Sequence, residues 1–134
     1  MKILLIEDNP LHVQAAIDQL SGHEITVFNN WKQFSNFGDF NGCPSAEKLL
    51  KFFKEYDMVL TDINMPVMDG IELTKQIRRH PNPKIQSLPV IVLTGSNLKE
   101  ATERIKEVGV TDFLLKPFSQ NDFVEMIRRN LIKH

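Results

Sequence analysis

Five side chains of this sequence have the types that phosphoryl transfer requires, and each lies at or just after the end of a short apolar run. They are Glu7, Asp8, Asp62, Thr94 and Lys116. Three carboxylates held close together repel one another unless a cation lies between them. Mg²⁺ suits such a group, since it binds through a few carboxylates and keeps water for phosphate oxygens. With a lysine and a hydroxyl to hold an anion beside the ion, these are the parts for transferring a phosphoryl group onto a carboxylate.

The apolar runs predict the strands that bring these side chains together. The runs over 3–6 and 89–93 are continuously apolar, which is typical of strands buried on both faces of a sheet. The predicted strands cover 2–6, 24–28, 57–61, 89–93 and 111–115, so that a loop begins at Asp62.

Segments with helical spacing of apolar residues alternate with these strands. Asn9-Pro10 is typical of the N-cap and first residue of a helix. The predicted helices cover 10–20, 46–55, 71–80, 98–108 and 119–131. This alternation predicts an α/β fold, a three-layer, doubly wound sheet of five parallel strands. The carboxyl ends of the strands then share one edge, where ligands bind, although the sequence does not give the strand order.

The connection between the second and third strands, residues 29–56, is longer than this fold requires. A helix of about 12 residues with loops of about 2–6 residues on each side needs roughly 16–24 residues. We therefore expect an insertion around 35–45 within a single domain over residues 1–134. Pro44-Ser45 could begin the helix over 46–55, and Asn30 could cap an earlier helix, so both arrangements stay open.

The composition is that of an ordinary globular domain, with 42% hydrophobic and 25% charged residues. A net charge of −1 gives no reason to expect direct binding to nucleic acid or to a membrane surface. No segment approaches the roughly 20 apolar residues of a membrane span. The lone Cys43 cannot form an internal disulfide, so we expect a reducing, cytoplasmic setting. The histidines are scattered, and we interpret them as surface residues: His12, His23, His80 and His134.

Four segments, in order, resemble those of the receiver domain of two-component response regulators, of the chemotaxis type. They are ILLIEDN, VLTDINMPVMDG, IVLTGS and GVTDFLLKPF. The resemblance covers nearly the whole chain and implies a flavodoxin-like (βα)5 fold. It also implies a phospho-accepting module of a phosphorelay, supplied by a histidine kinase or a histidine-phosphotransfer protein. Such a domain catalyses its own phosphorylation and dephosphorylation without being a metabolic enzyme. The downstream target and the oligomeric state stay open.

The resemblance implies a role for each acid of the site. Asp62 matches the phospho-accepting aspartate of the family. Asp8 matches the direct Mg²⁺ ligand, and Glu7 matches the acid that binds the ion through water. Asn64 matches the position whose backbone carbonyl completes the metal site.

The remaining roles concern the phosphoryl group and the response to it. Lys116 matches the lysine that pairs with this group, and Thr94 matches the switch hydroxyl. Phe113 matches the switch aromatic, a role that rests on the resemblance alone because an aromatic in a strand is core by default. Pro117 matches a proline that is typically cis. The resemblance implies that phosphorylation shifts a surface made by the fourth helix, the fifth strand and the fifth helix.

Three other functions are compared with this one. A haloacid-dehalogenase-type phosphatase would need a second Asp two positions after the nucleophile, where Asn64 stands. A dinucleotide or flavin binder would need G-x-G-x-x-G after the first strand, where Glu7-Asp8 would repel a pyrophosphate. A receiver that signals without phosphorylation is disfavoured because the catalytic set is intact.

Overall fold

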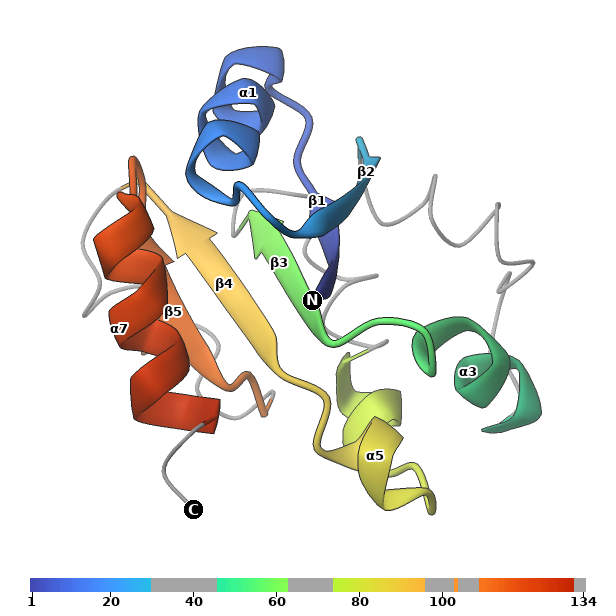
Figure 1. Cartoon of the computed structure of the whole chain (residues 1–134). Coiled ribbons are helices and arrows are strands. Elements are labelled where there is room, and N and C mark those ends of the chain that lie inside the picture. Colours follow the sequence, from blue (N-terminus) through green and yellow to red (C-terminus); the bar gives the residue numbers. More distant parts are fainter. Residues whose placement is uncertain (30–45, 63–73, 96–102, 104–108, 132–134) are drawn as a thin grey trace.

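Strands and helices alternate along the chain, as the apolar pattern predicts. The computed structural model describes residues 1–29, 46–62, 74–95, 103 and 109–131 (Figure 1). Its elements are β1 (Lys2–Ile6), α1 (Pro10–Gln19), β2 (Glu24–Phe28), α3 (Ala46–Phe53), β3 (Met58–Asp62), α5 (Pro83–Gln86), β4 (Val90–Thr94), β5 (Asp112–Leu115) and α7 (Gln120–Leu131). Residues 74–78 are also helical. The insertion expected around 35–45, the helix that Asn30 could cap and most of the helix over 98–108 lie outside the described residues.

The five strands form one parallel sheet in the order β2-β1-β3-β4-β5. The predicted flavodoxin-like α/β fold is therefore confirmed, and the strand order is added to it. The order reverses at β1, since the chain passes from β1 outwards to β2 and then returns to β3 on the other side. Crevices that bind ligands form at such a reversal, at the carboxyl ends of the strands.

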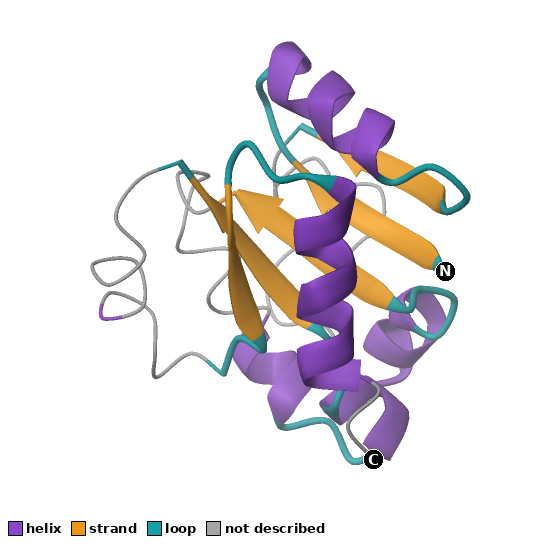
Figure 2. Cartoon of the chain, turned by 60° about the vertical axis from the view of Figure 1, so that its left-hand side comes forward, coloured by secondary structure: helices purple, strands orange, loops and turns teal. Residues whose placement is uncertain are grey.

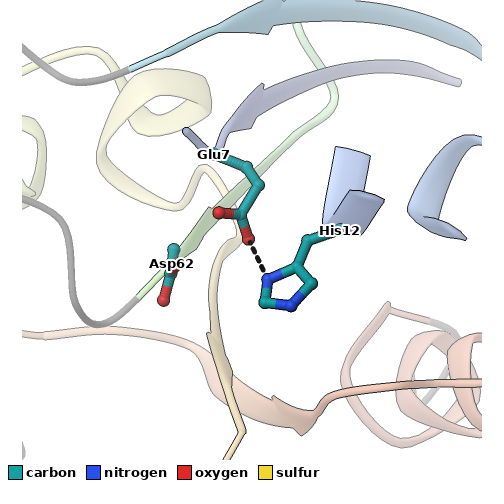
Figure 3. A group of neighbouring side chains, drawn as sticks. All are labelled: Glu7, His12 and Asp62. Atoms are coloured by element: carbon teal, nitrogen blue, oxygen red, sulfur yellow. Dashed lines mark ion pairs between the residues drawn. The ribbon is translucent and has the colours of Figure 1, made fainter. Parts of the chain in front are cut away.

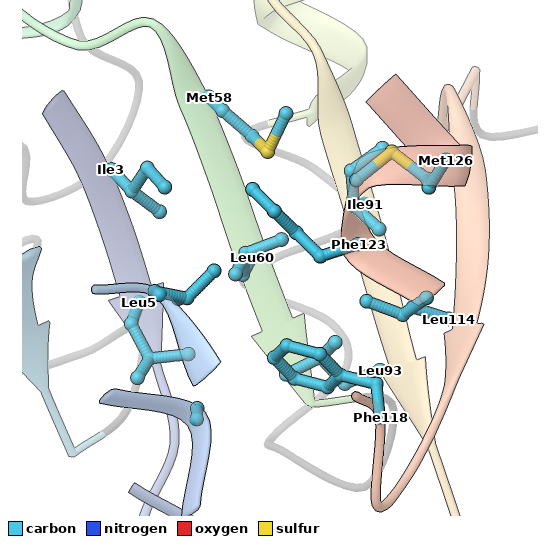
Figure 4. Packing of buried hydrophobic residues seen from close by; sticks show 12 residues of the cluster. Ile3, Leu5, Met58, Leu60, Ile91, Leu93, Leu114, Phe118, Phe123 and Met126 are labelled. Atoms are coloured by element: carbon cyan, nitrogen blue, oxygen red, sulfur yellow. The ribbon is translucent and has the colours of Figure 1, made fainter. Parts of the chain in front are cut away.

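The sheet separates the buried side chains into two clusters, because successive strand residues point to opposite faces. The α3-side cluster contains Leu4, Ile6, Phe28, Leu49, Phe53, Val59, Ile77, Ile85, Leu88 and Val90. The α7-side cluster contains Ile3, Leu5, Ala16, Leu20, Met58, Leu60, Ile91, Leu93, Leu114, Phe118, Phe123 and Met126 (Figure 4). Thus α1 and α7 cover one face, and α3 and α5 cover the other. Figure 2 shows α7 lying over the strands.

Two helices begin with the same pair of residues. Asn9 caps α1 by accepting hydrogen bonds from two backbone N–H groups of the first turn, and Pro10 is the first helical residue, as predicted. Asn82 and Pro83 begin the short helix α5 in the same way, and this helix is not among those predicted from the sequence. The prediction that His80 lies at the surface is wrong. Its side chain is 5% exposed, and its Nδ1 accepts a hydrogen bond from the Asn82 N–H at 3.0 Å.

Arg78 joins three segments at the amino edge of the sheet. Its Nε donates to the Gly109 carbonyl at 2.6 Å, and its Nη1 donates to the carbonyls of Gln86 at 2.9 Å and Leu88 at 2.8 Å. Its Nη2 donates to Thr111 Oγ1 at 3.1 Å. Burial lowers the pKa of this guanidinium. Gly109 has a φ of +96°, and a Cβ there would lie 3.0 Å from Arg78 Cγ, so the turn and the arginine fit together closely.

Asp112 ties β5 to α7. Its Oδ2 accepts hydrogen bonds from Arg129 Nε at 2.9 Å, Arg129 Nη2 at 2.7 Å and Asn130 Nδ2 at 2.7 Å. Its Oδ1 accepts one from the Phe113 N–H at 2.8 Å. Burial opposes ionisation of this carboxyl, but the hydrogen bonds from Asn130, Phe113 and Arg129 and the charge of Arg129 outweigh it. The pKa of Asp112 is therefore below its usual value.

Candidate functional site

The predicted site residues meet at the carboxyl edge of the sheet. Glu7 follows β1, Asp62 ends β3, Thr94 ends β4 and Lys116 follows β5. The strands β3 and β4 each run one residue further than the sequence predicted, because Asp62 and Thr94 still pair with the neighbouring strand. Both side chains therefore start from rigid backbone, and a loop does not begin at Asp62.

All four side chains are largely removed from solvent. Exposure is 1% for Glu7, 7% for Asp62 and 0% for Thr94, and 11% for the Lys116 side chain. Lys116 Nζ lies 2.9 Å from Glu7 Oε1 and 3.3 Å from Asp62 Oδ2. Two buried carboxylates this close would repel each other, and the ammonium between them offsets that repulsion.

His12, in the first turn of α1, completes the cluster. Its Nδ1 lies 3.5 Å from Glu7 Oε1 (Figure 3) and 3.0 Å from Lys116 Nζ. An ammonium group can only donate a hydrogen bond, so Nδ1 is the acceptor in its contact with Lys116. The side chain is 47% exposed, so the surface interpretation of His12 describes only its outer side.

Local structure explains why His12 reaches this place. Glu7 Oε2 accepts a hydrogen bond from the Asn9 N–H at 3.2 Å, and Asn9 in turn caps α1. The helix therefore begins against the acid that ends β1, and a side chain in its first turn lies over the site. An Asn-Pro pair two residues after Glu7 was the signal in the sequence that could have placed His12 here.

The acids differ in their positions relative to a possible ion. Among the described residues, Glu7, His12 and Asp62 have ligand atoms that all lie within 4.8 Å of one another. Asp8 is exposed and is not part of that group, and Asn64 lies outside the described residues. Carboxylate oxygens are the donors that Mg²⁺ prefers, so the donor set of Glu7 and Asp62, with Asp8 next in the chain, fits this ion.

The two proposed switch positions are connected to the site in different ways. Thr94 is fully buried, and its carbonyl accepts a hydrogen bond from the Lys116 N–H at 2.7 Å. Phe113 is partly buried on β5 and lies beside Val92 of β4. The peptide bond between Lys116 and Pro117 is cis.

A cavity of about 480 Å³ opens next to these residues, between α1 and the segment that follows β5. Lys116 and His12 line it on one side, and the remaining lining is mostly apolar: Ala15, Ala16, Leu93, Gly95, Pro117 and Phe118. The cavity therefore gives a molecule from outside access to Lys116 and His12.

A parallel sheet with acids at the β1 and β3 ends and a lysine after β5 is the arrangement of a receiver module. The family model of the response regulator receiver domain matches residues 3–128. The chain belongs to this family of two-component signalling domains.

Individual relatives agree with this membership. The receiver domain of sensor histidine kinase PA1611 from Pseudomonas aeruginosa PAO1, solved with a magnesium ion coordinated in its active-site cleft, is 28% identical. Its TM-score is 0.68, covering 96% of this chain and 94% of that one. Chemotaxis protein CheY4 of Vibrio cholerae is 26% identical with a TM-score of 0.68, covering 97% and 98%.

Among curated proteins, hybrid signal transduction histidine kinase I of Dictyostelium discoideum is 30% identical over 135 residues, covering 99% of this chain. The chain spans only 4–7% of the length of the Dictyostelium hybrid kinases I, G, M and B. Within the described part of the chain, no helix has the length and apolar character needed to cross a membrane.

Proposed function

We propose that this domain accepts a phosphoryl group on Asp62 and passes on the signal through a change of state. The observation that supports this most directly is the 3.3 Å contact between Asp62 Oδ2 and Lys116 Nζ at the edge of the sheet. The carboxylate lies on rigid backbone beside a cation that can pair with an incoming anion. A phosphorylation site needs both features, because positioning and charge stabilisation do most of the work in phosphoryl transfer.

In the proposed step, an oxygen of the ionised Asp62 carboxylate attacks the phosphorus of a phosphohistidine. The P–N bond breaks as the new P–O bond forms, and the ring nitrogen leaves with the electron pair and takes up a proton. Lys116 pairs with an oxygen of the transferred group, and the Thr94 hydroxyl donates to another. A Mg²⁺ held by Asp8 and Asp62, by Glu7 through water and by the Asn64 carbonyl would neutralise charge on the phosphoryl oxygens.

The proposed donor is a histidine kinase or a histidine-phosphotransfer protein. Two features support this choice. The matched relatives include hybrid histidine kinases, and the cavity beside Lys116 gives a donor a path to the site. After transfer, Thr94 would move towards the phosphoryl group, and Phe113 would follow, so that the surface around β5 and α7 changes state.

Labelling of the Asp62→Asn variant tests the proposal. The protein is incubated with acetyl phosphate or a phosphorylated kinase in Mg²⁺, and intact mass measures the addition of one phosphoryl group. Wild type should gain the group, and Asp62→Asn should not, since the amide is not a nucleophile of comparable strength. The matched control is Asp57→Asn, which alters an exposed acid at the amino end of the same strand segment and should label like wild type. Labelling of Asp62→Asn at the wild-type level would contradict the assignment.

A further inference from the structure

We propose that the outer edge of β2, together with a pocket beside it, binds an extended acidic segment of a partner protein as an additional strand of the sheet. Strand addition of this kind draws affinity from main-chain hydrogen bonds and specificity from pockets for alternate side chains. The surface lies at the edge of the sheet opposite to β5 (Figure 1). The inference goes beyond the proposed function, because none of its residues belongs to the site around Lys116.

The first support is the direction of the backbone groups of β2. Among the residues that the structure describes, β2 pairs with β1 alone. Glu24 at the start of β2 and Phe28 at its end each make a backbone hydrogen bond of 3.0 Å to the β1 side. Residues that bond to the same neighbour alternate along a parallel strand. Ile25 and Val27 therefore direct their N–H and carbonyl groups away from β1, towards the place of a further strand.

The second support is the sequence of β2. Edge strands are commonly protected by proline, by lysine or by a bulge. The strand reads Glu-Ile-Thr-Val-Phe, which contains neither proline nor lysine and has three β-branched residues that favour extended backbone. The strand at the opposite edge differs, because the Phe113 N–H already donates to Asp112 Oδ1 at 2.8 Å. Of the two edge strands, β2 is therefore the one that can accept another strand.

The third support is a pocket of about 510 Å³ on the α3 side of β2, called the edge pocket below. Its wall is partly apolar, because Phe52 and Tyr56 line it and are only partly buried against the α3-side cluster. Neighbouring strands lie about 4.8 Å apart, and facing side chains share one side of the sheet. A strand added outside β2 would therefore place one side chain beside Thr26, in the edge pocket. The lining residues are Thr26, Lys51, Phe52, Lys54, Glu55 and Tyr56.

The charges around the edge pocket favour an acidic partner. Lys51 and Lys54 are exposed in its lining, where Glu55 is the one acid among the lining residues. Lys84 brings a third ammonium close by, since its Nζ donates to the Lys54 carbonyl at 2.9 Å. Acidic side chains on both sides of an apolar anchor would complement these lysines. A second copy of this chain, paired antiparallel through β2, would bring two sets of the same lysines together, so a partner protein is the better occupant.

The test uses the capped peptide Thr-Asp-Val-Phe-Val-Glu-Thr, whose phenylalanine and two acids point to the same face of a strand. NMR titration of ¹⁵N-labelled protein measures its affinity. Amide hydrogen exchange of Ile25 and Val27 should slow when the peptide binds, because their outward N–H groups gain acceptors. Exchange of Thr26, which faces β1, should change little. The same peptide N-methylated across its Val-Phe-Val core keeps the charges and the anchor but loses its donors, and it should not bind.

Charge reversal of the edge pocket tests the partner chemistry. The double variant Lys51→Glu/Lys54→Glu changes only exposed side chains and should weaken binding of the acidic peptide about tenfold or more, since two favourable pairs become repulsive. It should bind a peptide with lysines in place of the two acids more tightly than wild type does. Arg79→Glu is the matched control, because Arg79 is exposed and is not among the lining residues of the edge pocket. Its affinity for the acidic peptide should equal that of wild type.

Three outcomes would overturn the proposal. The first is that the acidic peptide does not bind, or binds without slowing exchange of Ile25 and Val27. The second is that wild type binds the acidic and basic peptides equally well. The third is that exchange of these amides slows in the protein alone as its concentration rises, which would assign the edge to a second copy of the chain. Phosphorylation of Asp62 enters none of these measurements, so they are independent of the proposed function.

Discussion

Lys116 and Glu7, 109 positions apart in the chain, meet through a 2.9 Å contact between the ammonium and a carboxylate that is 1% exposed. We predict that Lys116→Met lowers the free energy of unfolding in Mg²⁺-free buffer by about 3 kcal/mol, because removing one partner of a buried pair leaves an uncompensated charge. Urea denaturation measures the effect. Mg²⁺ should restore more stability to this variant than it adds to wild type. Lys54→Met, at an exposed lysine, is the control and should behave like wild type. A Lys116→Met protein as stable as wild type without Mg²⁺ would show that the two acids do not need the lysine.

Asp8 is exposed and lies outside the cluster around Lys116. Its proposed role is therefore to bind the Mg²⁺ ion. We predict that Mg²⁺ raises the melting temperature of wild type and has no effect on Asp8→Ala. An ion that binds only the folded state adds about 2.7 kcal/mol at 100 times its Kd. Asp8→Ala should melt at or above the temperature of ion-free wild type, because one repelling charge is gone. Equal Mg²⁺ shifts in the two proteins would remove Asp8 from the ligand set.

Thr94 is fully buried and is the last residue of the strand β4, next to Asp62 and Lys116 at the site. We predict that Thr94→Val permits phosphorylation of Asp62 but weakens the response around Phe113. The substitution keeps the shape of the side chain and deletes the donor that should meet a phosphoryl oxygen. Amide chemical shifts on addition of beryllofluoride, a phosphoryl mimic, report the response. A wild-type pattern of shifts around Phe113 in the variant would show that Thr94 is not the switch.

Arg78 holds the turns at Gly109 and Gln86–Leu88 with four hydrogen bonds. We predict that Arg78→Lys lowers the free energy of unfolding by about 3 kcal/mol. A lysine cannot reproduce the planar fork, and partly buried carbonyls would lose their donors. Chemical denaturation measures the loss. Arg79→Lys alters the exposed neighbour and should change stability by less than about 0.5 kcal/mol. Similar losses of stability in both variants would mean that the hydrogen bonds of the Arg78 guanidinium do not account for the loss.

The depressed pKa of Asp112 makes the tether between β5 and α7 depend on pH. The pKa of Asp112 is higher in the unfolded state, near 3.8, than in the folded state. In acid the unfolded state therefore binds more protons at this carboxyl than the folded state does. The stabilisation from this group is therefore complete above pH 3.8 and is lost as the pH falls through the folded-state value. Asp112→Asn should be less stable than wild type at pH 7, and the difference should shrink below pH 3.8. Glu125→Gln, in an exposed pair with Arg128, is the control and should show little difference at either pH. A difference that stays constant down to pH 3 would exclude ionisation of Asp112 as its cause.

Much of the site could be predicted because its residues follow from local pattern. An apolar run ending in acids gives both a buried strand and the position of its carboxyl end, as at Glu7 and Asp62. Parallel pairing then brings these ends together without further information. The sequence indicates only a surface position for His12, because its contact with Lys116 depends on the segment after β5 reaching the same place.

Contacts between distant segments could not be predicted from one sequence. Nothing in the helical pattern around Arg78 distinguishes it from the exposed Arg79, and its partners at Gly109 and Thr111 lie more than thirty positions away. The strand order could not be predicted for the same reason, since it depends on which apolar strands pair in space. The helix α5 is different: its Asn82-Pro83 start repeats the signal at Asn9-Pro10 and could have been recognised.

Because the sheet divides the core into two clusters, amino-acid substitutions on its two faces can accumulate during evolution with little effect on each other. The α3-side cluster and the α7-side cluster share no side chain, so substitutions on opposite faces should have nearly additive effects on stability. The face that carries α1 and α7 also carries Phe118 and Leu93, which border the cavity beside Lys116. The face under α3 does not border this cavity, since the cavity on its side is a separate one lined by Thr26, Lys51, Phe52, Lys54, Glu55 and Tyr56. Mutations that stabilise the α3-side cluster should therefore offset losses of stability caused by substitutions around the cavity beside Lys116.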